Sequence, residues 1–416
     1  MGKIFSDAVE EALDYIFYNA RAGKGKEGLE ILKKASEEGD GDASCILARC
    51  YGGPQYIWYV HDFPEDDELF DKYIHKSVEQ GSALGVLVSI RCGEYSEEMA
   101  KKMPFANLKE VFNVVLEKAE AGDPFCQYTI GNTYFWWDFM DIEERTPESF
   151  PNREAFRAYL RENIMKCEEW FLKALRGGIH FAANNLRRLY TEGEEGIIEP
   201  RPELAKDLYK IGAESGHPDL QWGYGDDLKN AGKLKESIDM YKLAAEGGQL
   251  ECWYNVAHAY REGKVVPQDM KYAAECYEKC VVQKRINFSK KKSAAILGYM
   301  YCDGVSVPKD TEKAFYYLKM AEDCGETSRI AWLGKCYFYG WGTYKDDVKA
   351  RECIEKADTY DEECNYIMGV IYANGLGVKE DIGKGVKYLK NAPSLKEAKE
   401  ELAKYKKPLL GKWTRK

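Results

Sequence analysis

The sequence repeats one glycine-rich phrase four times in its C-terminal half. Placing Tyr260, Tyr301, Tyr337 and Tyr372 in register aligns residues 259–280, 300–321, 336–357 and 371–392 without a gap. Each copy has Gly three residues after the tyrosine, Asp nine residues after it and a small residue thirteen after it. The tyrosines are 41, 36 and 35 residues apart. A period in this range is typical of supersecondary units that stack on one another.

Each copy predicts two helices joined by a tight turn. An apolar residue, a small residue and the tyrosine have helical spacing in LGKCY (333–337), and related patterns occur at 47–51, 130–134, 256–260, 297–301 and 368–372. The glycine after the tyrosine is expected to end this helix, and the aspartate to cap the next one. Glycine inside a helix costs about 1 kcal/mol, so Gly334 and Gly369 need a packing reason, namely close approach of another helix.

A single helix pair cannot bury its own apolar face, so the 416 residues are expected to form one array of stacked pairs. Closing helices from residues 27–39 to 385–392 indicate about ten pairs. We predict an N-terminal capping helix in 1–24, divergent repeats in 25–249 with inserts at 52–66 and 135–165, regular repeats in 250–392, and a C-terminal capping helix with a basic tail in 393–416. The tail, YKKPLLGKWTRK, is expected to fray, although it could dock onto an acidic surface.

Composition narrows the classes of function. Sixty basic and 70 acidic residues give a net charge of −10, which argues against a general nucleic-acid or anionic-membrane surface.

No apolar run is long enough for a membrane span, and acids stand where a signal peptide would be apolar, so we expect a cytoplasmic protein. Gly2 fits the short myristoylation pattern, which often occurs by chance. The thirteen cysteines are not paired repeat by repeat, which indicates reduced thiols packed as small hydrophobic residues.

Motifs for catalysis, metals and cofactors are weak. None of the five histidines belongs to a metal-binding spacing, and AGKGKEG (22–28) lacks the phosphate-loop spacing. Cys276 and Cys280 are i and i+4 on one predicted helix, but no further ligands follow nearby. We therefore expect no catalytic residue, metal or cofactor, and a protein that is not an enzyme.

The order of aromatic residue, glycine-rich turn, Asp, Lys-Ala, aromatic residue and closing glycine resembles the Sel-one-like repeat (SLR) family, relatives of the tetratricopeptide repeat. The resemblance is strong over 250–392 and recognisable over about 25–250. Two departures are the short turn in 227–241 and Arg187, which stands at a small-residue position. The resemblance implies an all-α fold, a right-handed α/α superhelical solenoid, and a scaffold or adaptor that holds a protein or peptide partner.

Positions −3, +1 and +4 from the small residue of each first helix share one face. In the related tetratricopeptide fold this face lines a concave groove, so the resemblance implies the same here. Tyrosine and arginine are enriched at binding hot spots, and Arg188, Arg261 and Lys335 would supply positive charge for an acidic or C-terminal carboxylate ligand. An ordinary solvated surface is the alternative. The predicted partner-binding residues are Tyr128, Asn132, Phe135, Arg188, Tyr254, His258, Arg261, Tyr299, Lys335, Phe338 and Tyr366.

The aromatic stretch YFWWDFM (134–140) is a second candidate contact, through Trp136, Trp137 and Phe139. A helix in 153–163 could instead fold back and cover these rings. Three readings therefore stay open. The protein is an adaptor that binds a partner in its groove, a regulator or host-directed effector that grips a folded partner through its inserts, or a catalyst with an unrecognised site. The sequence does not indicate the oligomeric state.

Overall fold

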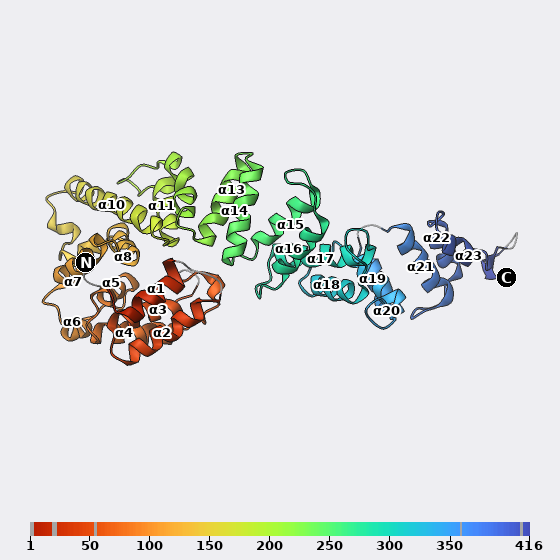
Figure 1. Cartoon of the computed structure of the whole chain (residues 1–416), viewed down its shortest axis with the longest axis horizontal. Coiled ribbons are helices and arrows are strands. Elements are labelled where there is room, and N and C mark those ends of the chain that lie inside the picture. The colour runs from red at the N-terminus through yellow and green to blue at the C-terminus, as the bar shows by residue number, and fades with distance from the viewer. Residues whose placement is uncertain (1–3, 19–22, 54–55, 358–359, 408–410) are drawn as a thin grey trace. The chain divides into compact units, whose positions relative to one another are not determined.

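A computed structural model describes residues 4–18, 23–53, 56–357, 360–407 and 411–416, so Gly2 lies outside the described residues. The described chain is mainly helical, as the repeats predict, and it divides into two compact units, Met1–Gln249 and Leu250–Lys416 (Figure 1). The second unit begins where the regular repeats begin in the sequence. None of the helices in the described ranges is long and apolar enough to cross a membrane.

The first unit consists of six helix pairs among its described residues: α1/α2, α3/α4, α5/α7, α8/α10, α11/α12 and α13/α14. Short helices α6 and α9 lie in the connections of the third and fourth pairs. The helices are α1 (Asp7–Leu13), α2 (Gly25–Glu37), α3 (Gly41–Tyr51), α4 (Asp67–Glu79), α5 (Ala83–Cys92), α6 (Glu97–Lys102), α7 (Leu108–Glu120), α8 (Pro124–Phe135), α9 (Phe139–Ile142), α10 (Arg153–Arg176), α11 (Phe181–Glu192), α12 (Leu208–Ala213), α13 (Pro218–Asn230) and α14 (Leu234–Gly247).

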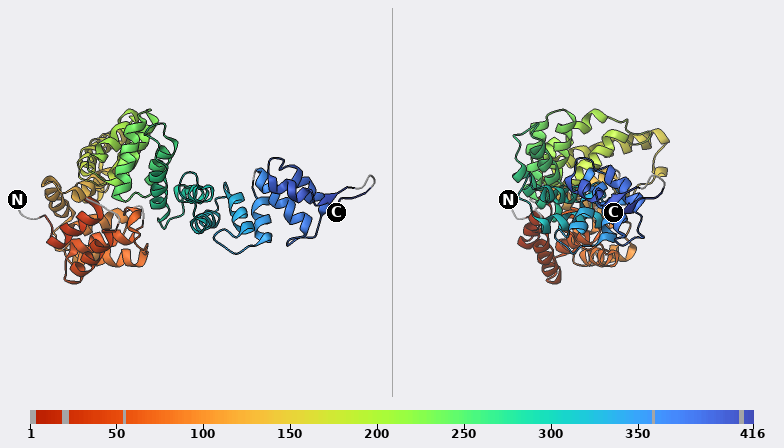
Figure 2. Two further views of the ribbon diagram at one scale, coloured as in Figure 1. Left: turned by 45° about the vertical axis from the view of Figure 1, so that its right-hand side comes forward. Right: turned by 90° about the vertical axis from the view of Figure 1, so that its right-hand side faces the viewer.

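The second unit adds four pairs, α15/α16, α17/α18, α19/α20 and α21/α22, which makes ten pairs in the described chain. Figure 2 shows the paired helices of each unit from two further sides. The elements are α15 (Cys252–Glu262), α16 (Met270–Val281), α17 (Phe288–Asp303), α18 (Thr311–Asp323), α19 (Ile330–Tyr339), α20 (Asp347–Glu355), α21 (Glu362–Asn374), α22 (Ile382–Lys390), α23 (Lys396–Leu402), β1 (Tyr405–Lys406) and β2 (Thr414–Arg415).

The turn within each regular repeat has the predicted local chemistry. The glycine after each aligned tyrosine ends its helix in the left-handed conformation; Gly375, for example, has a φ of 64°. The following aspartate caps the next helix, and the Asp381 carboxylate accepts a hydrogen bond of 2.8 Å from the Lys384 amide. The backbone amide of Asp381 donates a hydrogen bond to the Tyr372 carbonyl at 2.8 Å. Asp269, Asp310 and Asp346 repeat this arrangement. Each turn thus satisfies backbone groups at two helix ends.

The helical glycines permit close helix packing, as predicted. A Cβ on Gly369 would lie 2.6 Å from Leu389 Cγ, and one on Gly334 would lie 2.8 Å from Ile354 Cγ1. These contacts join the two helices of one pair, α21/α22 and α19/α20. Because interiors are close-packed, only glycine fits at these positions without a shift of the neighbouring helix.

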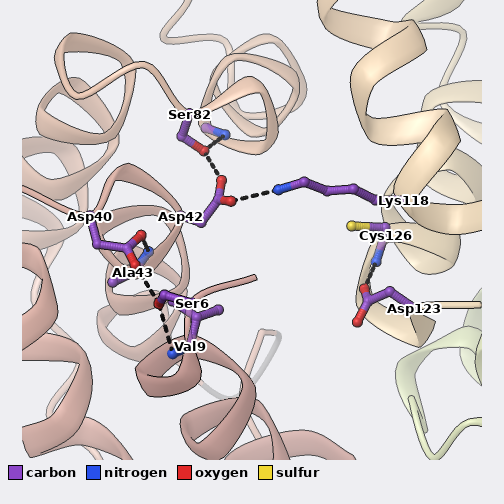
Figure 3. Close-up of polar contacts among 10 residues, drawn as sticks. Ser6, Val9, Asp40, Asp42, Ala43, Ser82, Lys118, Asp123 and Cys126 are labelled. Carbon is purple, nitrogen blue, oxygen red and sulfur yellow. Dashed lines mark hydrogen bonds and ion pairs between the residues drawn. The ribbon is translucent and has the colours of Figure 1, made fainter. Parts of the chain in front are cut away.

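Polar contacts also tie neighbouring pairs of the first unit together (Figure 3). The Asp42 carboxylate on α3 accepts from the Ser82 hydroxyl at 2.5 Å and lies 2.7 Å from Lys118 Nζ on α7. Ser82 in turn caps α5. One carboxylate therefore connects helices of two successive pairs, in addition to the apolar core between them.

Both inserts are integrated into the first unit. Trp58, from the 52–66 insert, is almost fully buried, and its ring lies 5.1 Å from that of His217 at the start of α13. Residues 153–165, which the sequence analysis assigns to the second insert, are the first half of the continuous helix α10. The second helix of this pair is lengthened rather than interrupted, because its sequence contains no breaker.

The two ends of the chain are built from different elements. Helix α1 packs on α2 as the first member of a pair. After α23, β1 and β2 form an antiparallel hairpin in which Tyr405 lies opposite Arg415. Arg415 Nη2 donates to the Ala373 carbonyl at 3.1 Å and lies 2.9 Å from Glu380. Arg415 of the basic tail thus pairs with an acidic residue of the preceding repeat, which agrees with the alternative that the tail docks onto an acidic surface.

Candidate functional site

The first helices of the second unit carry an aromatic stripe on the predicted face. Tyr254 on α15 packs edge-on against His258 and against Phe288 at the start of α17, with centroids 6.0 and 5.6 Å apart. Between α17 and α19, the Tyr299 and Trp332 rings lie 5.1 Å apart. These side chains are partly exposed. Neighbouring repeats thus bring their predicted residues into contact with one another or with a further ring.

The stripe continues from α19 to α21. Phe338 lies edge-on to Tyr366, with centroids 6.3 Å apart, and both rings are partly exposed. Arg329 stacks over the Tyr299 ring at 4.8 Å. Sequence reasoning did not select Trp332, Arg329 or Phe288, because they lie outside the −3, +1 and +4 positions of their helices. The sequence feature that could have identified these residues is their aromatic or basic character close to the selected positions.

The basic residues predicted to bind a partner differ in their exposure and in their ion pairs. Arg261 is half-buried on α15, and His258 Nδ1 lies 3.4 Å from Glu262. Lys335 is 1% exposed, and its ammonium contacts Asp361 at 2.6 Å and Glu363 at 2.7 Å. The interpretation of Lys335 as a charge for an acidic ligand is therefore corrected, since two carboxylates of the next repeat already neutralise it.

In the first unit, the corresponding face contains a cleft of about 720 Å³. Tyr128 and Asn132 of α8, both predicted partner-binding residues, line it. Asn132 Oδ1 accepts a hydrogen bond of 2.9 Å from Asn185 Nδ2 on α11. The lining residues are Arg49, Gly52, Tyr56, Asp67, Phe70, Asp71, Arg91, Cys92, Glu94, Tyr128, Asn132, Trp136 and Asn185.

Two further predicted residues lie beside this cleft. Phe135 is buried against Phe171, so it acts as packing beneath the surface. The Arg188 guanidinium on α11 stacks over the Phe135 ring at 5.1 Å and the Trp136 ring at 4.7 Å. Arg188 also lies 3.7 Å from Glu192, which offsets part of its charge.

The aromatic insert divides into a covered part and an exposed part. Phe139 is buried, and its ring lies 5.6 Å from Tyr159 of α10. The expected fold-back of 153–163 over these rings is thus present, and it removes Phe139 from the surface. Trp137 is half-buried, whereas Trp136 is 41% exposed and lines the cleft. Trp136 therefore remains the accessible ring of the three.

Arg49 is a cleft residue that the sequence analysis missed. Its side chain is 4% exposed, and its Nε has no hydrogen-bond partner among the described residues. The guanidinium is held among the rings of Tyr56, Phe125 and Tyr128. Arg49 stands at +1 from Ala48 in LARCY, so the rule that selected Asn132 would also have selected it.

Three buried histidines form a second unpredicted cluster in the first unit. The His180 and His217 rings lie 4.3 Å apart, and Trp58 packs on both His61 and His217. Burial lowers the pKa of all three histidines, and brings that of His180 to about 3. Because burial disfavours the charged form, the three rings pack against their neighbours as neutral groups.

Comparisons with known proteins agree with the repeat architecture. The Sel1 repeat family model matches residues 157–179, 181–217, 252–279, 291–326, 330–357 and 362–392. Proteins built from Sel1 repeats generally act in protein–protein interaction. Among curated proteins, the chain is 26% identical over 293 residues to the ERAD-associated E3 ubiquitin-protein ligase component HRD3B of Arabidopsis thaliana. The match covers 59% of this chain and 46% of that protein, so it spans about half of the relative's length.

Two solved structures are also similar. One is c5321, a protective antigen of uropathogenic Escherichia coli with an SLR fold, at 18% identity and a TM-score of 0.36 over 90% of this chain and 89% of that one. The other is a Sel1 repeat protein from Oxalobacter formigenes, at 23% identity and a TM-score of 0.41 over 80% and 86% of the two chains. With six matched repeats and an architecture of helix pairs, the chain is a Sel1-like repeat protein.

Proposed function

We propose that the protein is a scaffold, rather than a catalyst. It binds a protein or peptide partner on its first-helix faces, which are the surfaces formed by positions −3, +1 and +4 of the first helix in each repeat. The observation that carries this proposal is the aromatic stripe of the second unit. Rings from consecutive first helices touch across the repeat boundary, as Tyr299 does with Trp332 and Phe338 with Tyr366, yet stay partly exposed. Rings that pack on one another are held in place before a partner arrives.

Such a stripe suits partner binding for two physical reasons. Aromatic side chains offer a large contact area and have few rotatable bonds, so fixing them on binding costs little conformational entropy. Their positions on successive helices present contacts at the spacing of the repeats, which matches an extended partner better than a compact ligand. Arg261 and Arg329 at the edge of the stripe add positive charge for an acidic group of the partner.

The curated relative supports a role in an assembly. HRD3B of Arabidopsis thaliana is described as a component of an E3 ubiquitin-protein ligase, and the present chain matches about half of its length. A role as one part of a larger complex agrees with the partly exposed aromatic rings on successive first helices.

The proposal is tested by capturing partners from the native cell with matched variants of the full chain. Tyr254→Ala with Arg261→Ala, and Tyr299→Ala with Phe338→Ala, change the first-helix face. Tyr316→Ala with Tyr344→Ala is the control, since these rings are 59% and 94% exposed and lie on α18 and in the turn before α20. We expect both face variants to lose a partner that the control retains, with unchanged circular dichroism. Equal recovery by all variants would refute the assignment.

The exposed ring of Trp136 favours a second contact, with a folded partner, at the insert. This contact corresponds to a regulator or effector that grips its target from outside the stripe. Trp136→Ala should then weaken binding of such a partner, whereas Phe139→Leu, a change at a buried ring of the same insert, should leave affinity unchanged. Equal affinity of the wild type and Trp136→Ala would argue against the insert contact.

A further inference from the structure

We infer that the cleft of the first unit binds an acidic side chain of a peptide segment that carries basic residues beside it. The inference deepens the proposed function at Tyr128 and Asn132, and it rests on that function only in taking the ligand to be a peptide. It starts from Arg49, a nearly buried arginine that lines the cleft, and from the acidic residues that line the same cleft.

Arg49 is an uncommitted cation. It is 4% exposed, its Nε lacks a hydrogen-bond partner, and no ion pair of the described residues includes it. The rings of Tyr56, Phe125 and Tyr128 lie 5.3, 5.1 and 5.5 Å from its guanidinium carbon. Contacts with aromatic faces offset only part of the cost of removing a guanidinium from water. A carboxylate would supply the missing charge and the fork of acceptors that arginine prefers.

The residues near Arg49 favour a carboxylate over a neutral group. Asn132 Oδ1 accepts a hydrogen bond from Asn185 Nδ2, and the Asn132 Nδ2 group carries two N–H donors that can serve a ligand in the cleft. Arg91, the other arginine of the cleft, is already paired with Asp138 at 2.7 Å. Arg49 and Asn132 therefore supply donors toward the cleft.

The acidic residues of the cleft select the remainder of the ligand. Asp67 and Asp71 on α4 are exposed, and Glu94 is half-buried. Three carboxylates that line the cleft would repel a compact anion such as phosphate or a peptide rich in acids. They would attract lysine or arginine next to the inserted acid, which makes the cleft complementary to a segment of mixed charge.

The depth of Arg49 indicates how the acid reaches it. A glutamate side chain extends its carboxylate away from its backbone, so the backbone can stay near Asp67 and Asp71 while the acid contacts the nearly inaccessible arginine. The volume of about 720 Å³ lies in the range of sites that hold one small ligand, which corresponds to a few residues of a peptide. We therefore assign an internal glutamate rather than a chain terminus.

The test uses the full chain with ¹⁵N-labelled arginine and capped peptides as probes. The probe is acetyl-Ala-Lys-Glu-Lys-Ala-amide, and the comparison peptides replace Glu by Gln, replace both Lys by Ala, or move the acid to a free C-terminus. We expect the probe to shift the Arg49 Nε–H resonance in a saturable manner. The Gln peptide should bind at least tenfold more weakly, and the peptide without Lys several-fold more weakly.

Two variants test separately the role of Arg49 and the role of the acidic residues of the cleft. Arg49→Lys retains the positive charge but removes the planar guanidinium group, so it should weaken binding of the probe peptide several-fold. Asp67→Asn with Asp71→Asn changes only exposed acids, so it should fold normally and remove the preference for Lys; Asp347→Asn in the second unit is the matched control and should have no effect. Equal binding of the Glu and Gln peptides would overturn the inference, and preference for the free C-terminus would overturn the glutamate assignment. Failure of these peptides with intact partner capture would leave the proposed function standing.

Discussion

The ammonium group of Lys335 on α19 lies 2.6 Å from the carboxylate of Asp361, which is also the residue that caps α21. One carboxylate therefore both starts a helix and binds the preceding repeat. Burial lowers the pKa of Lys335, but hydrogen bonds to Asp361 and Glu363 outweigh burial and raise the pKa overall. The lysine stays charged and acts as a link between repeats rather than as a free cation on the binding face.

Replacement of Lys335 by Met should therefore lower stability. The change leaves Asp361 and Glu363 close together without their cation. Both acids are partly exposed, so we expect a loss of about 1–3 kcal/mol in unfolding free energy, less than for a fully buried pair. Urea unfolding measures the loss. Lys396→Met, at an exposed pair with Glu400, is the control and should change stability by less than about 0.5 kcal/mol. Equal stability of the two variants would show that the buried link contributes nothing.

The same substitution at two helical glycines should have opposite results. In Gly369→Ala the new Cβ would lie 2.6 Å from Leu389 Cγ, so we expect a loss of roughly 1–3 kcal/mol from overpacking. Gly383 on α22 is exposed, with only Asp381 Oδ1 at 3.4 Å, and Gly383→Ala should leave stability unchanged or raise it by up to about 1 kcal/mol. Thermal melting of both proteins checks the prediction. If Gly369→Ala melts like the parent, the assigned contact between α21 and α22 is wrong.

The aspartate that caps the second helix of each regular repeat should stabilise the folded protein through its hydrogen bond. Asp346 Oδ1 accepts a hydrogen bond of 2.9 Å from the Lys349 amide, and Asp346→Ala removes it. Loss of a cap of this kind costs about 1 kcal/mol. Asp347→Ala removes an acid from the first turn of the same helix without removing the cap, so it should cost only about 0.3 kcal/mol. Equal losses in urea unfolding would contradict the capping role of Asp346.

The buried histidines should make stability fall in acid. Burial holds the pKa of His180 at about 3, whereas an unfolded histidine titrates near pH 6.5. Above pH 6.5 both states are neutral, and below it the unfolded chain gains a proton that the folded protein does not accept. Stability is therefore lost as the pH falls from about 6.5 toward 3, and His180 alone should account for about 2 kcal/mol between pH 7 and pH 5.

The variant His180→Gln should weaken this pH dependence. Unfolding free energies measured at pH 7 and pH 5 should differ by about 2 kcal/mol less than in the parent. The parent protein, measured at the same two pH values, is the control. An unchanged dependence in His180→Gln would mean that His180 binds protons equally in the folded and unfolded states.

The repeat itself could be predicted from sequence because its causes are local. Gly375 ends a helix in the left-handed conformation and Asp381 caps the next one, and both roles depend on neighbours within ten residues. The tight packing at Gly369 followed from the same pattern, since a glycine inside a helix requires a close contact. These features need no knowledge of the remainder of the chain.

Contacts between distant segments could not be predicted in this way. The helix rule placed Lys335 on a face, but it did not reveal that Asp361 and Glu363 of the next repeat cover that position. In the histidine cluster, His180 and His217 are in direct contact, and Trp58 and His61 join them because the 52–66 insert folds against later helices. Arg49 was detectable by the rule that selected Asn132, whereas its lack of a partner is a property of the folded protein.

The most direct measurement of the central claim is hydrogen–deuterium exchange of the full chain with and without its captured partner. If the first-helix faces bind the partner, protection should increase in α15, α17, α19 and α21, around Tyr254, Tyr299 and Phe338. The paired helices α16, α18, α20 and α22 should change less. Protection confined to these second helices, with none on the first helices of either unit, would contradict the account.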